Sequence, residues 1–430
     1  MTRLVCFSLL VCVAACNAPN RTDPVTGKEF YSPVAGDYAS QDRNIRARFI
    51  METRLANEGG LLPEPAIQSA CQDVFDRVAA AVPPEHRRGF QYHFVLTAAP
   101  DVNAYTYGGG RVHCHLGLLA RCRDEAEFAS VVAHEIGHNS HDHVSQGIGR
   151  QERAVSILNF GRGIPGQGVL ARVGGLIASV ALVQHTREEE READQRAIEY
   201  LFAAGYDPDG AARFFEAMER DFGGRGAQFL QTHPFPRNRV KTIRATIAAR
   251  GGAPAGSMRS SPAFDAAVRR ARVILPYYDS LYGALGGDDI AAVHAAADKG
   301  IAALPNHAAF HFWKGLATDA SKEPKAALGA VRRAAALDDT NVLIPLVHGA
   351  MELSAHNYPR AEGAASNAIR IIPALPAPYL VRGVARLGLG RKSEAFGDFD
   401  RAVSLLPEGD RRQLVDAIRE QVPEYEYKKG

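Results

Sequence analysis

The feature that most restricts the possible folds of this chain is a period of 34 residues in its C-terminal part. Glycine recurs at this period at Gly315, Gly349 and Gly383, and alanine recurs in two further series that begin at Ala327 and Ala334. Small residues in a fixed register are expected where two antiparallel helices touch, because a bulky side chain there would push the helices apart. The period therefore predicts a stack of helical hairpins.

A period of 34 residues is typical of tetratricopeptide repeats. We therefore predict an all-α domain of this type over residues 274–430, with a degenerate first unit near Ile274 to Tyr278. The small-residue stretch GGAPAGSMRSSPA, which begins at Gly251, favours a linker over residues 251–273. A chain of 430 residues is too long for one ordinary core, so residues 41–250 are expected to form a second domain.

The N-terminus has the pattern of an export signal. The apolar run from Leu4 to Val13 has the size of a signal segment and is too short to span a membrane as a helix. It ends in Ala14-Ala15-Cys16, which resembles the bacterial lipobox, in which the Cys is acylated. We therefore expect a lipoprotein signal peptide over residues 1–16, a polar tether over residues 17–40, and a lipid anchor that holds the mature chain in the periplasm.

Other sequence features bear on location and partners. Asn17 implies the outer membrane, because Asp at this position favours the inner membrane in enteric bacteria; a plain secretory signal, which would give a soluble periplasmic protein, is the alternative. The formal net charge is only +2 and the basic residues are scattered, so no nucleic-acid partner is expected. Three cysteines, Cys71, Cys114 and Cys122, would remain after processing; either one disulfide forms, or all three are buried small apolar residues.

Residues 41–250 are predicted to be mainly helical with a small β-sheet. Gly108-Gly109-Gly110 favours a hairpin turn between two strands. We expect His113 and His115 to lie exposed on an edge strand, and the short apolar run Val173–Val183 to be a buried core helix. The predicted strands are Gln91–Thr97, Ala104–Tyr107 and Arg111–His115, and the other predicted helices are Gln41–Asn57, Ala66–Val82, Asp124–His143 and Arg187–Ala204.

The segment from His134 to His138 reads His-Glu-Ile-Gly-His, the HExxH pattern. On a helix, residues four apart lie on one face, so both imidazoles can bind one Zn²⁺. Glu135 would then face the attacking water as its general base. Apolar neighbours such as Val131 and Ile136 bury this helix, and a metal ion would satisfy side chains that are otherwise costly to bury.

A catalytic zinc ion needs three protein ligands and an open position for water. The metzincin spacing does not supply the third ligand, because His141 and Val144 stand where it requires Gly and His; His141 is expected at the surface or at the helix end. Glu190 and Asp194 share a face of a second helix. We therefore predict Glu190 as the third ligand and Asp194 as the acceptor of a hydrogen bond from a ligand His.

The HExxH pattern followed about fifty residues later by Glu-Arg-Glu-Ala-Asp, from Glu190, resembles the gluzincin metallopeptidase family of the CAAX-prenyl-protease, HtpX and BepA type. The resemblance covers roughly residues 23–245, and a repeat domain after the peptidase is the layout of the periplasmic BepA-like branch. Two departures are Tyr105 for the usual Phe, and Asp142 for Arg before His143. Further matching segments are Asp23–Gly27, Asn103–Tyr105, Gly109-Gly110, Gly117–Leu119, Ala204–Pro208, and Thr232-His233-Pro234 with Arg239.

The resemblance implies a zinc endopeptidase with one Zn²⁺ per chain, acting on unfolded or misassembled envelope proteins in quality control at the outer membrane. It implies that His233 lies near the metal, where it would either occupy the fourth position and hold the enzyme latent or have an orienting role; His233 or Arg239 would stabilise the oxyanion. An extended peptide is expected to add along the strand Gly110–His115. The repeats would recruit unfolded outer-membrane proteins or an assembly machine.

Two alternatives to a peptidase remain. One is a tetratricopeptide scaffold for outer-membrane assembly with a latent or inactive peptidase domain; the intact Glu135 argues against it, because a protein that does not catalyse hydrolysis has no need of the base. The other is a zinc hydrolase of non-peptide cell-wall material, for which the sequence carries no sugar-binding signature.

Overall fold

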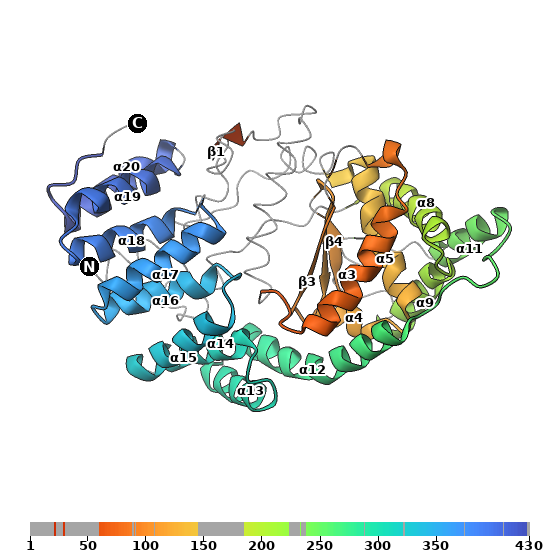
Figure 1. The fold of residues 1–430 in the computed structure, drawn as a ribbon, viewed down its shortest axis with the longest axis horizontal. Helices are drawn as coiled ribbons and strands as arrows, with labels where there is room; N and C mark the ends of the chain where they lie inside the picture. Colours follow the sequence, from red (N-terminus) through yellow and green to blue (C-terminus); the bar gives the residue numbers. More distant parts are fainter. Residues whose placement is uncertain are drawn as a thin grey trace.

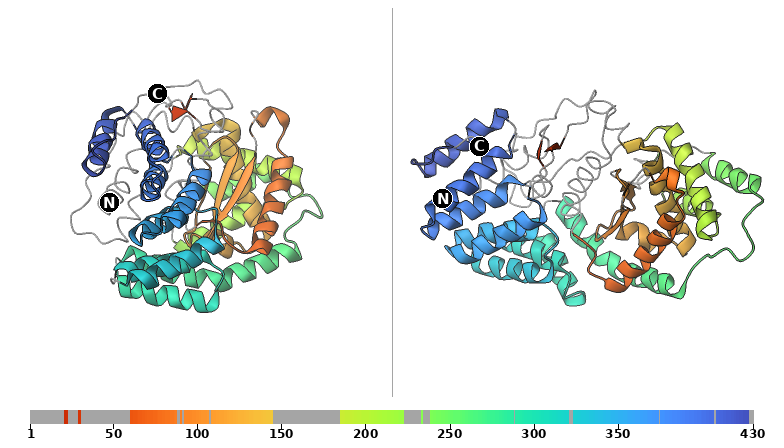
Figure 2. Two further views of the ribbon diagram at one scale, coloured as in Figure 1. Left: turned by 60° about the vertical axis from the view of Figure 1, so that its left-hand side comes forward. Right: turned by 45° about the horizontal axis from the view of Figure 1, so that its top comes forward.

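The structure is a computed structural model in which two groups of helices lie next to each other, joined along α12 (Pro262–Gly286) (Figure 1). Figure 2 shows the same arrangement from two further directions. The residues described are 21–22, 29–30, 60–87, 90, 92–106, 108–144, 185–222, 233, 238–287, 289–320, 323–373, 375–406 and 408–427. The predicted signal peptide with Cys16, the helix over Gln41–Asn57 and the apolar run Val173–Val183 lie outside these residues.

The N-terminal group is built around a three-stranded sheet in the order β3 (His93–Thr97), β5 (Arg111–His115), β4 (Ala104–Thr106). β4 and β5 are antiparallel and joined by Gly108–Gly110, in which all three glycines have positive φ, a conformation that other residues rarely adopt. The predicted hairpin is therefore confirmed. A separate pair of short strands, β1 (Arg21–Thr22) and β2 (Glu29–Phe30), falls within the predicted tether.

The prediction that β5 is an exposed edge strand is wrong. β3 pairs with β5 in parallel, so that β5 is the central strand, and His113 and His115 are 0% and 2% exposed. The pairing joins segments that a local sequence pattern does not connect. The outer side of β3 is covered, because Leu62 donates its backbone N–H to Leu96. Within the described part of the chain, the outer edge of β4 pairs with no strand.

Two helices, α3 (Pro65–Ala80) and α5 (Glu125–His141), pack against this sheet. Aromatic rings link the layers: Phe75 of α3 contacts Phe94 of β3 at 5.3 Å between ring centroids, Phe94 contacts Phe128 of α5 at 6.2 Å, and Phe128 contacts Phe264 of α12 at 5.5 Å. Phe75, Phe128 and Phe264 are buried, and full burial stabilises each by about 1.5–3 kcal/mol. The core therefore runs from the sheet into α12.

Capping residues set the ends of the two helices that carry the predicted site. Asp124 accepts a hydrogen bond from the backbone N–H of Glu127 at the start of α5. α8 (Arg187–Ala204) begins with a capping box of Thr186 and Glu189 and ends at Gly205, which is left-handed. The predicted bounds of α8 are those observed. The remaining elements of this part are η1 (Pro84–His86), α4 (Leu116–Arg121), α9 (Gly210–Phe222) and α11 (Arg239–Ala249).

The C-terminal part is all-α, as predicted. Its glycines of 34-residue spacing lie at contacts between the helices of one hairpin: a Cβ on Gly315, Gly349 or Gly383 would lie 3.1, 3.4 or 3.2 Å from the carbonyl oxygens of Ala327, Ala361 and Ala395, respectively. The expectation that small residues mark helix contacts is confirmed. The helices are α13 (Ile290–Ala303), α14 (Ala308–Ala320), α15 (Pro324–Leu337), α16 (Leu343–Ser354), α17 (Tyr358–Ile371), α18 (Pro376–Gly388), α19 (Lys392–Ser404) and α20 (Glu408–Gln421).

The connection between the two parts, expected as a linker over residues 251–273, is helical from Pro262 onward. α12 begins at Pro262, with Ser261 accepting a hydrogen bond from the N–H of Phe264. Near its middle, Arg272 donates to the backbone carbonyl of Cys122, and further on Tyr278 bonds to His307 at 2.8 Å. One continuous helix thus belongs to both parts, and only residues 251–261 are irregular.

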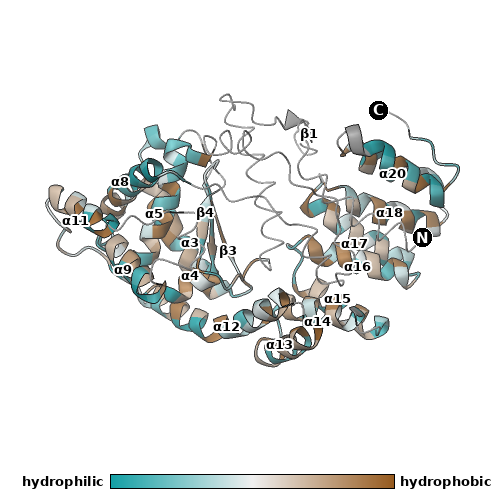
Figure 3. Cartoon of the chain, turned by 180° about the vertical axis from the view of Figure 1, so that it is seen from behind, coloured by the Kyte–Doolittle hydropathy of each residue, from teal (hydrophilic) through white to brown (hydrophobic). Residues whose placement is uncertain are grey.

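The hydropathy of the helices and the state of the cysteines can be compared with the sequence expectations. None of their helices is long and apolar enough to cross a membrane, and the labelled helices mix polar and apolar residues (Figure 3). Cys71, Cys114 and Cys122 are buried and free, so of the two alternatives for these cysteines the structure shows three buried small residues. Burial raises the pKa of all three thiols, which makes them inert.

Candidate metal centre

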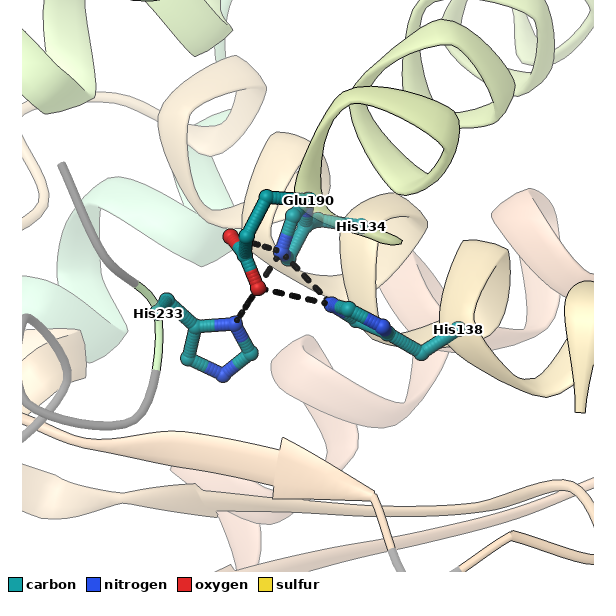
Figure 4. Close-up of side chains that lie close together, drawn as sticks. All are labelled: His134, His138, Glu190 and His233. Atoms are coloured by element: carbon teal, nitrogen blue, oxygen red, sulfur yellow. Dashed lines mark hydrogen bonds and ion pairs between the residues drawn. The ribbon is translucent and has the colours of Figure 1, made fainter. Parts of the chain in front are cut away.

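Four side chains converge between α5 and α8: His134 and His138 of α5, Glu190 of α8, and His233 (Figure 4). Each offers one ligand atom, the four atoms all lie within 4.8 Å of one another, and every residue is buried. The three predicted ligands are therefore brought together, and His233 joins them. His233 thus lies beside the three predicted ligands, as a residue near the metal would.

The spacing of these four atoms fits a single tetrahedral ion. Ligand atoms bound to zinc at about 2.0–2.1 Å in a tetrahedron lie about 3.3–3.4 Å apart. His138 Nε2 lies 3.1 Å from His134 Nε2 and 3.3 Å from Glu190 Oε1. His233 Nδ1 lies 3.3 Å from His134 Nε2 and 2.9 Å from Glu190 Oε1. Imidazole nitrogens and a carboxylate are also the donor set that zinc prefers.

The charges around the centre favour a cation. Burial alone would raise the pKa of Glu190, but His233, Arg239 and His134 hold it well below its usual range, so this carboxylate is ionised. Burial lowers the pKa of His138 well below its usual range, which keeps the ring neutral and able to bind a metal. The carboxylates of Glu190 and Asp194 are thus ionised around neutral His138, and a metal cation would balance their negative charge.

Asp194 and Arg239 form a support behind the ligands. Asp194 Oδ1 accepts from His134 Nδ1 at 3.0 Å, which leaves His134 Nε2 to face the centre. Burial alone would lower the pKa of His134, but Glu190 and Asp194 raise it to about 9, so a metal ion bound there would displace a proton. Arg239 binds Asp194 through Nη2 and Nε at 2.7 and 2.8 Å, binds Glu190 through Nη1 at 2.9 Å, and stacks on Phe215 at 4.0 Å. Its donors are directed at two carboxylates rather than at Glu135.

Glu135 lies beside the ligand set rather than in it. Its side chain is fully buried, and Oε1 lies 3.4 Å from Nε2 of His233. Burial raises the pKa of Glu135 to about 8. A divalent cation at the four ligands would favour the ionised form, because an adjacent positive charge stabilises a carboxylate. The group therefore has both the position and the environment of a base that exchanges a proton near neutral pH.

Two residues of the centre, His185 and His143, were not assigned a role from the sequence. His185 stacks on His138, with ring centroids 3.8 Å apart, and directly precedes the capping Thr186. His143 bonds to His138 and to Glu192, and its motif position was the only signal that could have found it. His141, expected at the surface or at the helix end, is the last residue of α5 and lies part-buried near Glu192 and Arg196.

Gly137→Ala is expected to weaken the packing of α5 on α8. A Cβ on Gly137 would lie 2.8 Å from the carbonyl oxygen of Ala193 and 3.1 Å from its Cα, and backbone atoms cannot move aside cheaply. Alanine gains about 1 kcal/mol of helix propensity over glycine, whereas overpacking costs about 1–3 kcal/mol. We therefore expect a lower unfolding midpoint in urea.

The matched control is Gly363→Ala on α17, where a Cβ meets nothing within 4 Å. This variant should gain stability from helix propensity alone. Equal gains in both variants would show that α5 and α8 do not depend on the close approach at Gly137.

Comparison with known proteins agrees with this geometry. Residues 64–247 match the model of peptidase family M48. A putative beta-barrel assembly-enhancing protease of Vibrio cholerae is 27% identical over 283 residues, which cover 63% of this chain and 56% of the relative. The beta-barrel assembly-enhancing protease of Escherichia coli is 29% identical over 36% of this chain and 34% of its own length. The metalloprotease LoiP of Escherichia coli is 29% identical over 38% of this chain and 66% of its own length.

Proposed function

We propose, from the premise that residues 64–247 form a domain of peptidase family M48, that this chain is a zinc-dependent endopeptidase. The observation that carries the proposal is the convergence of His134, His138 and Glu190 on one point, with Glu135 buried beside it. The deciding experiment is cleavage of an unfolded reporter by the purified chain beside its Glu135→Gln variant, with and without a chelator.

The ligands His134, His138 and Glu190 would hold Zn²⁺, which supplies a Lewis acid for the scissile carbonyl and for the attacking water. Glu135 takes the proton of the water as it attacks and delivers it to the leaving amine. Arg239 keeps Glu190 and Asp194 in place, and because all three of its nitrogens face these two carboxylates we assign it a positioning role rather than oxyanion stabilisation.

The substrate backbone is proposed to bind along β4. The sequence favoured β5 for this role, but β5 is central and β4 has the open edge among the described strands. β4 packs on α5, the helix that carries Glu135, and Thr106 at the end of β4 bonds to Asn139 of α5 at 3.0 Å. A peptide added to this edge would be held mainly by backbone hydrogen bonds, so cleavage would tolerate many side chains.

His233 is proposed to keep the enzyme latent. Its Nδ1 occupies the fourth corner of the ligand set, and a site with four protein ligands leaves no position for water. Its Nε2 also contacts Glu135, so one side chain blocks both the ion and the base. Cleavage would then require His233 to leave the centre.

His233→Ala is expected to raise basal cleavage of an unfolded reporter by about tenfold, because the active fraction increases when the closed arrangement is lost. Initial rates at equal zinc content measure the effect, and His311→Ala on α14 is the matched control. Unchanged or reduced cleavage in His233→Ala would instead indicate an orienting or oxyanion-stabilising role for His233.

The substrates are proposed to be unfolded or misassembled envelope proteins at the outer membrane. Two of the relatives carry names that link them to beta-barrel assembly, and the helical hairpins of residues 274–430, proposed to be tetratricopeptide-like, offer a surface for substrates or an assembly machine. The lipid anchor at Cys16 and the periplasmic location belong to the same proposal. The Glu135→Gln variant distinguishes this function from the alternative, a scaffold with an inactive peptidase domain.

A further inference from the structure

We propose that Glu192 and His143 form a relay of hydrogen bonds behind His138, which fixes the tautomer of this ligand and directs its Nε2 lone pair at the metal. The inference rests on the proposed function, because it assigns positioning residues to the same metal centre.

The relay consists of two short contacts between α5, the residues after it, and α8. His138 Nδ1 lies 2.9 Å from His143 Nδ1, and His143 Nε2 lies 3.0 Å from Glu192 Oε2. α5 ends at His141, and the next residue, Asp142, has a left-handed backbone with φ of 60°, which turns the chain and brings His143 back onto His138. His143 is buried, and Glu192 is part-exposed at the outer end of the relay.

The direction of every hydrogen bond follows from the carboxylate. A carboxylate can only accept, so His143 must carry its hydrogen on the Nε2 that faces Glu192. Neutral His143 then has a lone pair on Nδ1, which accepts from Nδ1–H of His138. The Nε2 of His138 is left with its lone pair, as a metal ligand requires.

The other histidine ligand is fixed in the same way without an intermediate. Asp194 accepts from Nδ1–H of His134, so Nε2 of His134 also presents a lone pair. The two Nε2 atoms lie 3.1 Å apart, and two lone pairs that face each other at this distance need a metal ion or a proton between them. A cation between them resolves this arrangement. One stretch of α8 therefore supplies three carboxylates with different tasks: Glu190 binds, Asp194 orients His134, and Glu192 orients His138 through His143.

A second metal site is the rival interpretation of the same cluster. One ligand atom from each of His141, His143 and Glu192 lies within 4.8 Å of the others. However, an ion on Nε2 of neutral His143 would move its hydrogen to Nδ1, where it would face Nδ1–H of His138 at 2.9 Å. His141 Nε2 accepts from Arg196 Nε at 3.3 Å, which favours a hydrogen on the Nδ1 that faces Glu192. The hydrogen bonds therefore favour a relay over an ion.

Glu192→Gln tests the relay, because an amide can either donate or accept and no longer sets the direction. Competition with a chelator should show a zinc affinity about 10–100-fold lower than that of the full-length wild-type chain. Glu188→Gln, an exposed position of α8 paired with Arg191, removes the same charge and should leave the affinity unchanged. Equal affinities in the two variants would overturn the proposal.

A double-mutant cycle separates the relay from a general loss of packing. In His143→Gln the new side-chain carbonyl can accept from Nδ1–H of His138 without help from Glu192. Adding Glu192→Gln to this background should therefore have no further effect on zinc affinity, whereas independent effects would multiply. Multiplying effects would contradict the relay.

Nitrogen NMR of the full-length chain labelled at histidine reads the tautomers directly. In the metal-free chain, His143 should be the Nε2–H form and His138 the Nδ1–H form, and Glu192→Gln should mix these forms. His143 as the Nδ1–H form, or two zinc ions per loaded chain, would overturn the relay. Absence of zinc binding in the wild type would contradict the proposed function. The tautomers of the metal-free chain would still test the relay independently of that result.

Discussion

Replacing Glu135 by Gln is expected to lower the cleavage rate of an unfolded reporter by about 10²–10⁴-fold, the contribution of a general acid–base group. Glutamine has nearly the same shape but cannot take a proton from water. Glu135 is fully buried and lies outside the set of ligand atoms, so the substitution should leave the metal bound. Initial rates and the zinc content per chain, measured on the same preparation, check both parts of this expectation.

The result separates an enzyme from a scaffold. Wild type treated with a chelator shows the rate without metal, and Glu188→Gln shows the effect of removing a carboxylate elsewhere. If Glu135→Gln keeps its zinc and cleaves as fast as the wild type, the base has been assigned to the wrong residue. If the wild type itself cleaves nothing and the cellular phenotype survives the substitution, the scaffold alternative holds.

Glu190→Gln is expected to remove the metal from the chain. Glu190 is the carboxylate among the four candidate ligands, its pKa is held well below its usual range, and it neutralises Arg239 at 2.9 Å. An amide supplies no negative charge. Loss of a residue that only orients a ligand can lower zinc affinity by up to about 100-fold, and loss of the ligand Glu190 should lower it further. Metal analysis after dialysis and chelator competition measure the loss.

Thermal unfolding gives a second readout of the same substitution. A ligand that binds only the folded state raises the apparent stability. The chelator should therefore lower the unfolding temperature of the wild type and of Glu199→Gln, a matched position of α8 paired with Arg196, but not that of Glu190→Gln. A Glu190→Gln chain that retains one tightly bound zinc and cleaves the reporter would rule out this ligand set.

The helices could be predicted from the sequence because their signals are local. α8 has its capping box and its terminal glycine within its own segment, and its bounds agree with the prediction. The position of β5 could not be predicted, because it depends on parallel pairing with β3, whose strand is separated from it by β4. The start of α12 at Pro262 could not be predicted, because the small residues before Phe264 resemble a linker. The helix is stabilised there by the packing of Phe264 on Phe128, which the local sequence does not show.

The metal ligands could be predicted from i, i+4 spacing, but the proposed relay of Glu192 and His143 could not. Two residues apart on a helix, Glu190 and Glu192 point in directions about 200° apart at 3.6 residues per turn, so the sequence suggests that only one of them faces the site. α8 crosses α5 closely at Gly137, and the chain after α5 turns back at Asp142. Glu192 therefore meets His143, a contact that depends on tertiary packing rather than on local pattern.

The continuous helix α12 limits which polypeptides the two parts could handle together. With 25 residues and a rise of about 1.5 Å per residue, it is about 37 Å long along its axis. Phe264 fixes it to the sheet side and Tyr278 to the hairpins. If the hairpins bind a polypeptide substrate, they cannot swing it towards the metal centre, because α12 is fixed at both ends. The substrate itself must then span the distance with an unfolded segment, on the order of ten extended residues for a distance comparable to the length of α12. A substrate with such an unfolded segment would be cleaved, and a tightly folded one would not.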